Sequence, residues 1–238
     1  MQPPYPPKAG IPFLLNQAFS YWIRTLLYQV LFSLITFSLF FAVAYYASVR
    51  YGVLGPYLEL SEKLAISMEA YQGGVQEIMK LPGFTTFYWI LIGCAVFLFP
   101  LNLGLFTLYR KLDNGEKLQV SDLFEGYRGA RFFSFASFYL FWIMVYLFTL
   151  PTLFLGVFWV LLTLFTAPLM LFAKRRLFET LSLNFTALKR FPLEIIACCL
   201  VAILFKYAGM FTIIGAVFTY PFFTAVIYVL YRKIFYES

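Results

Sequence analysis

Four long runs of the chain contain no Asp, Glu, Lys or Arg. These runs are residues 25–49, 81–109, 132–173 and 207–231. About 20 helical residues cross the roughly 30 Å hydrocarbon core of a bilayer. Three of the runs are therefore long enough to cross once, and the 42-residue run 132–173 is long enough to cross twice. A further apolar stretch, 192–208, has only Glu194 and Lys206 as charged residues and supplies one more crossing.

The pattern predicts an all-α, polytopic membrane protein with six transmembrane helices in a single membrane domain, residues 1–238. The predicted spans are about 25–47, 84–109, 132–150, 153–173, 192–208 and 211–231. Pro100 lies within the second span and is expected to kink it, because proline lacks a backbone donor. The third and fourth spans are predicted to turn between Pro151 and Gly156, and Pro192 is predicted to begin the fifth span.

The segment 48–83 between the first two spans is polar and acidic, and it is predicted to form an extracytoplasmic insertion. Its apolar residues recur at helical spacing, which predicts one amphipathic helix that ends at Gly73-Gly74. These apolar residues are Tyr57, Leu60, Leu64, Met68 and Tyr71. Residues 1–7 are rich in proline and are predicted to be irregular.

A short amphipathic segment precedes each predicted pair of spans, and the three segments look alike. Each has a small polar residue, a Phe three positions later, and a cation four or five positions after the Phe. The matching residues are Asn16, Phe19 and Arg24; Ser121, Phe124 and Arg128; and Ser182, Phe185, Lys189 and Arg190. The Phe side chains are expected to enter the headgroup region while the cations face lipid phosphates. Two interpretations stay open: a threefold repeat of surface helix and hairpin, or convergence of segments that all lead into a membrane.

The cations are distributed unevenly about the spans. If both termini are cytoplasmic, all but four of the 18 Lys and Arg residues lie on the cytoplasmic side. The four on the opposite side are Arg50, Lys63, Lys80 and Lys206. Cytoplasmic loops of membrane proteins are enriched in Lys and Arg, so we expect both termini to be cytoplasmic. The same bias accounts for the net charge of +7 without a nucleic-acid partner.

Composition argues against an enzyme. Hydrophobic residues form 62% of the chain and charged residues 12%, whereas about a quarter of an ordinary soluble domain is charged. Histidine, the commonest general base and metal ligand, does not occur in the sequence. Cys94, Cys198 and Cys199 lie in apolar runs and are interpreted as small buried hydrophobic residues. We therefore predict no catalytic residue, no metal and no cofactor.

Four acidic residues lie close together in the second cytoplasmic connection: Asp113, Glu116, Asp122 and Glu125. Asp113-Asn114-Gly115 is typical of a turn. Ser121 is predicted to cap a short helix that has Asp122 and Glu125 near its N-terminus, where acids favour the helix dipole. A solvated loop is therefore favoured over a metal site.

Residues 84–238 resemble a poorly characterised group of bacterial six-span membrane proteins. That group is related to the membrane domain fused to some glycerophosphodiester phosphodiesterases and is similar in layout to YciC-like inner-membrane proteins. The residues behind the resemblance are Leu123-Phe124-Glu125-Gly126, Ala167-Pro168-Leu169, the helix from Thr180-Leu181-Ser182 to Lys189-Arg190, and the stretch from Gly215 to Pro221. The resemblance implies a location in the bacterial inner membrane. It implies no activity, because the phosphodiesterase catalytic domain is absent from this sequence.

Polar residues within the spans are the remaining candidates for function. Pro100, Asn102 and Gly104 mark a possible kink or cavity in the second span, although kink repair explains Asn102 equally well. Glu194 and Lys206 lie near the two ends of the fifth span, and Lys206 is expected to extend to the outer interface. A second group of residues is predicted to contact anionic lipid headgroups: Lys174, Arg175, Arg176, Lys189 and Arg190.

Two functional hypotheses follow. The favoured one is a non-enzymatic accessory or scaffold subunit of a membrane complex, with membrane lipids and other membrane proteins as partners. It draws on the Phe-rich face of the third span: Phe132, Phe133, Phe135, Phe138 and Phe141. The alternative is a carrier of a lipid or small molecule that uses a cavity near Asn102.

Overall fold

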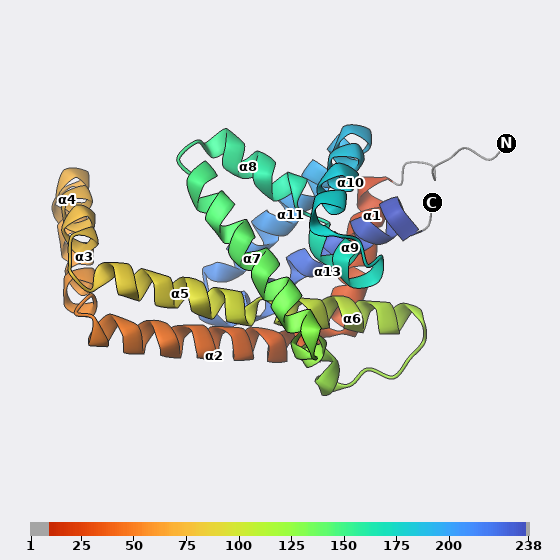
Figure 1. Ribbon diagram of the computed structural model, residues 1–238, viewed down its shortest axis with the longest axis horizontal. Helices are drawn as coiled ribbons and strands as arrows, with labels where there is room; N and C mark the ends of the chain where they lie inside the picture. Colours follow the sequence, from red (N-terminus) through yellow and green to blue (C-terminus); the bar gives the residue numbers. More distant parts are fainter. Residues whose placement is uncertain (1–9, 237–238) are drawn as a thin grey trace. The chain divides into compact units, whose positions relative to one another are not determined.

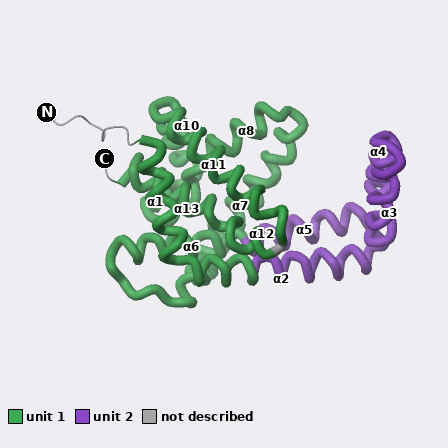
Figure 2. The backbone as a smooth tube through the Cα atoms, turned by 180° about the vertical axis from the view of Figure 1, so that it is seen from behind, with its two compact units in different colours: residues 1–34, 99–238 green, residues 35–98 purple. Residues whose placement is uncertain are grey.

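The structure is a computed structural model that describes residues 10–236, so the irregular segment predicted for residues 1–7 lies outside the described range. Within that range all regular elements are helices. Two compact units are formed, and each is described by itself (Figure 2). Unit 1 comprises residues 1–34 and 99–238, and unit 2 comprises residues 35–98.

Six helices are long and apolar enough to cross a membrane, which confirms the predicted number of spans. They are Leu26–Arg50, Phe84–Asp113, Ala130–Thr149, Leu153–Phe172, Pro192–Met210 and Ile214–Tyr236. The predicted hairpin turn between the third and fourth spans and the start of the fifth span at Pro192 are also confirmed. The protein is a multi-pass integral membrane protein.

The order of elements repeats three times along the chain (Figure 1). Each segment has a short helix, then one continuous span, then one span that is broken into two helices. The first segment contains α1 (Ile11–Arg24), α2 (Leu26–Arg50), and α5 (Phe84–Leu98) followed by α6 (Leu101–Asp113), with the two helices of the insertion between α2 and α5. The second contains the 3₁₀ helix η1 (Val120–Tyr127), α7 (Ala130–Thr149), and α8 (Leu153–Leu162) followed by α9 (Thr166–Phe172). The third contains α10 (Leu177–Arg190), α11 (Pro192–Met210), and α12 (Ile213–Thr219) followed by α13 (Phe222–Tyr231), with the π-helical turn η2 (Arg232–Tyr236) at its end.

Within unit 1 the three segments contact one another in a cyclic order. The second half of each broken span packs against the short helix of the next segment: α6 against η1, α9 against α10, and α13 against α1. The three second halves also meet, because α6 contacts both α13 and α9, and the Phe172 ring of α9 lies 6.2 Å from that of Tyr228 in α13. The core of unit 1 is therefore built from α6, α9 and α13.

Glycines allow the closest of these contacts. A Cβ atom added at Gly104 in α6 would lie 2.2 Å from the carbonyl oxygen of Leu123 in η1. A Cβ atom at Gly126 in η1 would lie 2.3 Å from the carbonyl oxygen of Pro100. Close backbone approach at small residues is the usual basis of helix packing in membranes, where apolar burial contributes little between helices.

Two local predictions were wrong. The cap of η1 is Gln119 rather than Ser121, because the Gln119 backbone N–H donates to Asp122 at 2.9 Å. The insertion forms two helices, α3 (Leu54–Ile66) and α4 (Met68–Met79), and α4 continues through Gly73-Gly74. The break falls at Ser67, whose hydroxyl accepts a hydrogen bond from the Ala70 N–H and so caps α4.

Unit 2 packs α3 and α4 around a small apolar cluster of Val53, Leu60 and Ile78. A Cβ atom at Gly74 would lie 2.9 Å from the Leu60 side chain, so the glycine serves close packing. Lys63 and Glu77 form an ion pair at 2.5 Å. The hydrogen bond between them raises the pKa of Lys63 and lowers that of Glu77.

Candidate functional site: a cavity within the membrane spans

A cavity of about 330 Å³ lies within unit 1 at the points where the broken spans are interrupted. Each broken span contributes a lining residue at its break and another three positions later: Phe99 and Asn102 in the second span, Leu164 and Ala167 in the fourth, and Tyr220 and Phe223 in the sixth. The second and sixth spans add Phe106 and Ile227 seven positions after the first residue, and Val160, Thr163 and Thr224 line the cavity outside this pattern. The cavity is thus a product of the threefold order of elements.

At each break a side chain forms a hydrogen bond with a backbone group. Asn102 Nδ2 donates to the Phe99 carbonyl at 3.0 Å. The Phe165 N–H donates to Asn184 Oδ1 of α10 at 2.8 Å. Trp22 Nε1 of α1 donates to the Phe218 carbonyl at 3.0 Å. Irregular backbone at membrane depth requires such partners, so the three interruptions are stable parts of the fold.

An aromatic stack forms one wall of the cavity. The rings of Phe99 and Tyr139 lie parallel with their centroids 4.1 Å apart, and Trp142 continues the stack 5.6 Å from Tyr139. The indole N–H of Trp142 donates to the Thr163 hydroxyl at 2.7 Å, which connects α7 to the break in the fourth span. The wall therefore offers aromatic faces, and the indole N–H of Trp142 is already engaged in a hydrogen bond.

Lys206 brings a positive charge to the cavity. Its side chain extends from α11, and Nζ lies 4.5 Å from the centroid of the Tyr220 ring, at the break of the sixth span. Among residues 10–236 no carboxylate lies within ion-pair distance of this ammonium group. The cavity thus combines one cation, the Asn102 amide, threonine hydroxyls and aromatic rings, a combination that is typical of binding sites with a small number of orienting polar groups.

The predicted kink residues have three different roles. Pro100 stands at the break between α5 and α6, as predicted. The Asn102 amide gives the Phe99 carbonyl at the break a second hydrogen bond, beside that from the Asn102 backbone N–H, and also lines the cavity. Gly104 faces η1 and does not line the cavity.

Unit 2 contains a larger groove of about 740 Å³, and its lining has no charged side chain. Aromatic and aliphatic residues of α2 to α5 make up nearly all of this lining. Such a groove gives a ligand little orientation. The cavity of unit 1 is therefore the better candidate site.

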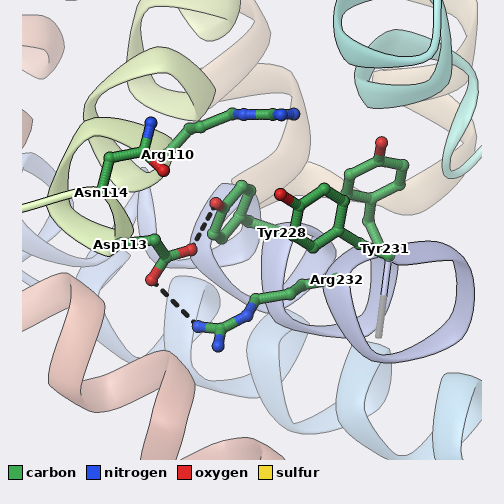
Figure 3. A pocket seen from close by; sticks show the side chains of 7 residues that line it. Arg110, Asp113, Asn114, Tyr228, Tyr231 and Arg232 are labelled. Atoms are coloured by element: carbon green, nitrogen blue, oxygen red, sulfur yellow. Dashed lines mark hydrogen bonds and ion pairs between the residues drawn. The ribbon is translucent and has the colours of Figure 1, made fainter. Parts of the chain in front are cut away.

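A second polar group of unit 1 surrounds Asp113 at the end of α6 (Figure 3). The carboxylate accepts hydrogen bonds from the hydroxyl groups of Tyr21 and Tyr228, the latter at 2.6 Å, and from Arg232 Nη1 at 2.9 Å. Burial and the hydrogen bond to Asp113 raise the pKa of Tyr21 to about 12. The adjacent pocket measures about 20 Å³, enough for one water molecule. We interpret this group as a connection between α1, α6 and α13.

Replacement of Asp113 by alanine is expected to lower the free energy of unfolding by about 1–2 kcal/mol. The change removes three acceptor contacts, and the partial exposure of Asp113 and Arg232 keeps the cost below that of a fully buried pair. Reversible unfolding in detergent, followed by circular dichroism, measures the difference. Glu116→Ala is the control, because Glu116 is an exposed acid of the same loop and should change stability by less than about 0.5 kcal/mol. Equal stabilities of the two variants would contradict the interpretation.

The cations predicted to contact lipid headgroups are all exposed: Lys174, Arg175, Arg176, Lys189 and Arg190. Arg175 lies 3.8 Å from Glu179, and Lys189 Nζ lies 4.3 Å from the Phe185 ring centroid. Phe178 and Phe185 on α10 are also exposed, whereas Thr180, Asn184 and Ala187 form its buried face. This distribution leaves the lipid-contact prediction in place without testing it.

Comparison with known protein families, with curated proteins and with solved structures finds no match for this chain. The site must therefore be interpreted from its own residues.

Sequence reasoning missed two parts of the site. The prediction for Lys206 named the outer interface and did not include the cavity that this residue lines. The breaks of the fourth and sixth spans were also missed, although Pro168 and Pro221 were available as signals there. Pro221 directly precedes α13 as Pro100 directly precedes α6, whereas Pro168 lies within α9, two residues after its start.

Proposed function

We propose that this protein binds a small amphiphilic molecule in the cavity of unit 1 and carries it within or across the membrane, without catalysis. The observation that carries the proposal is the cavity itself, which three interrupted spans line with aromatic rings and a few polar groups. Discontinuous spans of this kind form the substrate sites of many transporters. The volume of about 330 Å³ lies at the lower end of the range for small-molecule sites.

The other hypothesis, an accessory or scaffold subunit, receives less support. It draws on the Phe-rich face of the third span, yet Phe135 and Phe138 of that face are buried within this chain. Exposed members such as Phe133 suit contact with lipid as well as contact with a protein. Both termini cytoplasmic stays part of the proposal because of the cation distribution, and a bacterial inner membrane stays part of it because of the resemblance described above.

Filling the cavity is expected to weaken ligand binding. Ala167→Phe adds a ring to the cavity wall and removes no polar group. We expect the affinity for decanol and decanoate, measured by equilibrium binding to protein in phosphatidylcholine nanodiscs, to fall at least about tenfold, because the ring occupies the volume that the chain of the ligand needs.

The matched control is Ala208→Phe, since Ala208 is an exposed residue of α11 two positions after Lys206. It should bind both probes as the unaltered protein does. Undiminished binding by Ala167→Phe would contradict the proposed function, as would an unaltered protein that binds neither probe.

A further inference from the structure

We infer that the ligand of this cavity is an organic anion and that the Lys206 ammonium group holds its charged end. The inference rests on the proposed function, which it makes more specific. The structural basis is the place of one cation among otherwise uncharged lining residues.

The position of Lys206 differs from that of an interfacial anchor. Lys206 is four residues before Met210, so its Cα lies about 6 Å inside the end of α11 at 1.5 Å per residue. A lysine that extends to the interface would direct its ammonium group past that end. Instead Nζ lies over Tyr220, six residues or about 9 Å into the sixth span. The side chain is directed toward the break and the cavity.

A cation at this depth is costly unless it has a partner, and intramembrane charges usually mark a functional site. Elsewhere in unit 1 the chain supplies such partners itself, as Asp113 does for Arg232 and Asp122 does for Lys111. Throughout residues 10–236, by contrast, the partner found for the Lys206 ammonium is the face of an aromatic ring. A ligand carboxylate or phosphate would complete the pairing.

The uncharged residues that line the cavity indicate the chemistry of the uncharged part of the ligand. Stacked rings of Phe99, Tyr139 and Trp142 favour an aromatic or single-chain apolar body. A lysine acts as a point charge and does not require the two-oxygen geometry that arginine favours, so it accepts a carboxylate and a phosphate alike. The ligand class is therefore a small amphiphilic anion, present either as a free acid or as the headgroup of a membrane lipid.

Charge selectivity tests the inference. In nanodiscs of phosphatidylcholine at pH 8, the unaltered protein should bind decanoate and decyl phosphate at least about tenfold more tightly than decanol. Lys206→Met should remove this preference by weakening the binding of the anions while leaving that of decanol unchanged. Lys206→Arg should restore the preference. Retained decanol binding by Lys206→Met shows that the variant is folded.

The outcomes separate this inference from the proposed function. An equal affinity of the unaltered protein for decanoate and decanol overturns the inference, and so does a preference that persists in Lys206→Met. The proposed function survives both results, provided that Ala167→Phe still blocks decanol. Nanodiscs that contain phosphatidylglycerol distinguish the two sources of the anion: competition with decanoate assigns the site to a lipid headgroup, and lack of competition assigns it to a free acid. Either result of that last comparison supports an anion site.

Discussion

Gly104→Ala is expected to lower the free energy of unfolding by about 3 kcal/mol, although alanine favours helices more than glycine does. The added Cβ would lie 2.2 Å from the carbonyl oxygen of Leu123 and 2.4 Å from its Cα. Both atoms belong to the backbone, so no side-chain rotation relieves the overlap. The contact between α6 and η1 must therefore open.

The measurement is unfolding of the purified protein in detergent, and Gly93→Ala provides the matched control. Gly93 lies in the other half of the same span, and a Cβ atom there would meet nothing within 4 Å. Its replacement should leave stability unchanged or raise it by up to about 1 kcal/mol through helix propensity. If Gly104→Ala unfolds at the same temperature as Gly93→Ala, the close approach of α6 to η1 is not present in the protein.

The spans could be predicted from the sequence because their signal is local. A charged residue at the centre of a bilayer costs several kcal/mol, so a long run without Asp, Glu, Lys or Arg identifies a crossing before any packing is known. The hairpin turn near Pro151 and the start of the fifth span at Pro192 followed from proline geometry in the same local way. The number and approximate limits of the spans needed no tertiary information.

The interior of unit 1 could not be predicted in this way. Apolar residues occur on all sides of a membrane helix, so periodicity does not tell which face meets lipid and which meets another helix. On α10 the apolar face with Phe178 is exposed, and the buried face is formed by Thr180, Asn184 and Ala187. This short helix therefore packs on the protein through small and polar residues while Phe178 and Phe185 stay exposed.

The cavity was partly predictable. Asn102 beside Pro100 indicated a break at that depth, since an amide in a span needs a partner. The direction of Lys206 was not predictable, because it depends on the distant break that brings Tyr220 beneath the ammonium group. The matching positions of Phe99, Leu164 and Tyr220 became recognisable only when all three breaks were known.

Asn184→Ala is expected to lower the free energy of unfolding by about 2 kcal/mol and to weaken ligand binding. Asn184 is fully buried, accepts from the Phe165 N–H at 2.8 Å and donates to the Thr180 carbonyl at 2.7 Å. Alanine supplies neither group, and the Phe165 N–H then loses its partner at membrane depth, where no water replaces it. The break of the fourth span positions Leu164 and Ala167, and it would lose the hydrogen bond that connects it to α10.

Two measurements check this prediction: unfolding in detergent, and binding of decanol in nanodiscs. Asn16→Ala on the equivalent surface helix α1 is the control, because Asn16 is exposed and its replacement should change both quantities little. We expect Asn184→Ala to lose both stability and affinity, since the same hydrogen bond fixes the break and the cavity wall. A variant that is destabilised yet binds decanol normally would show that the break of the fourth span does not shape the binding site, and a variant of normal stability would show that the Phe165 N–H finds another partner.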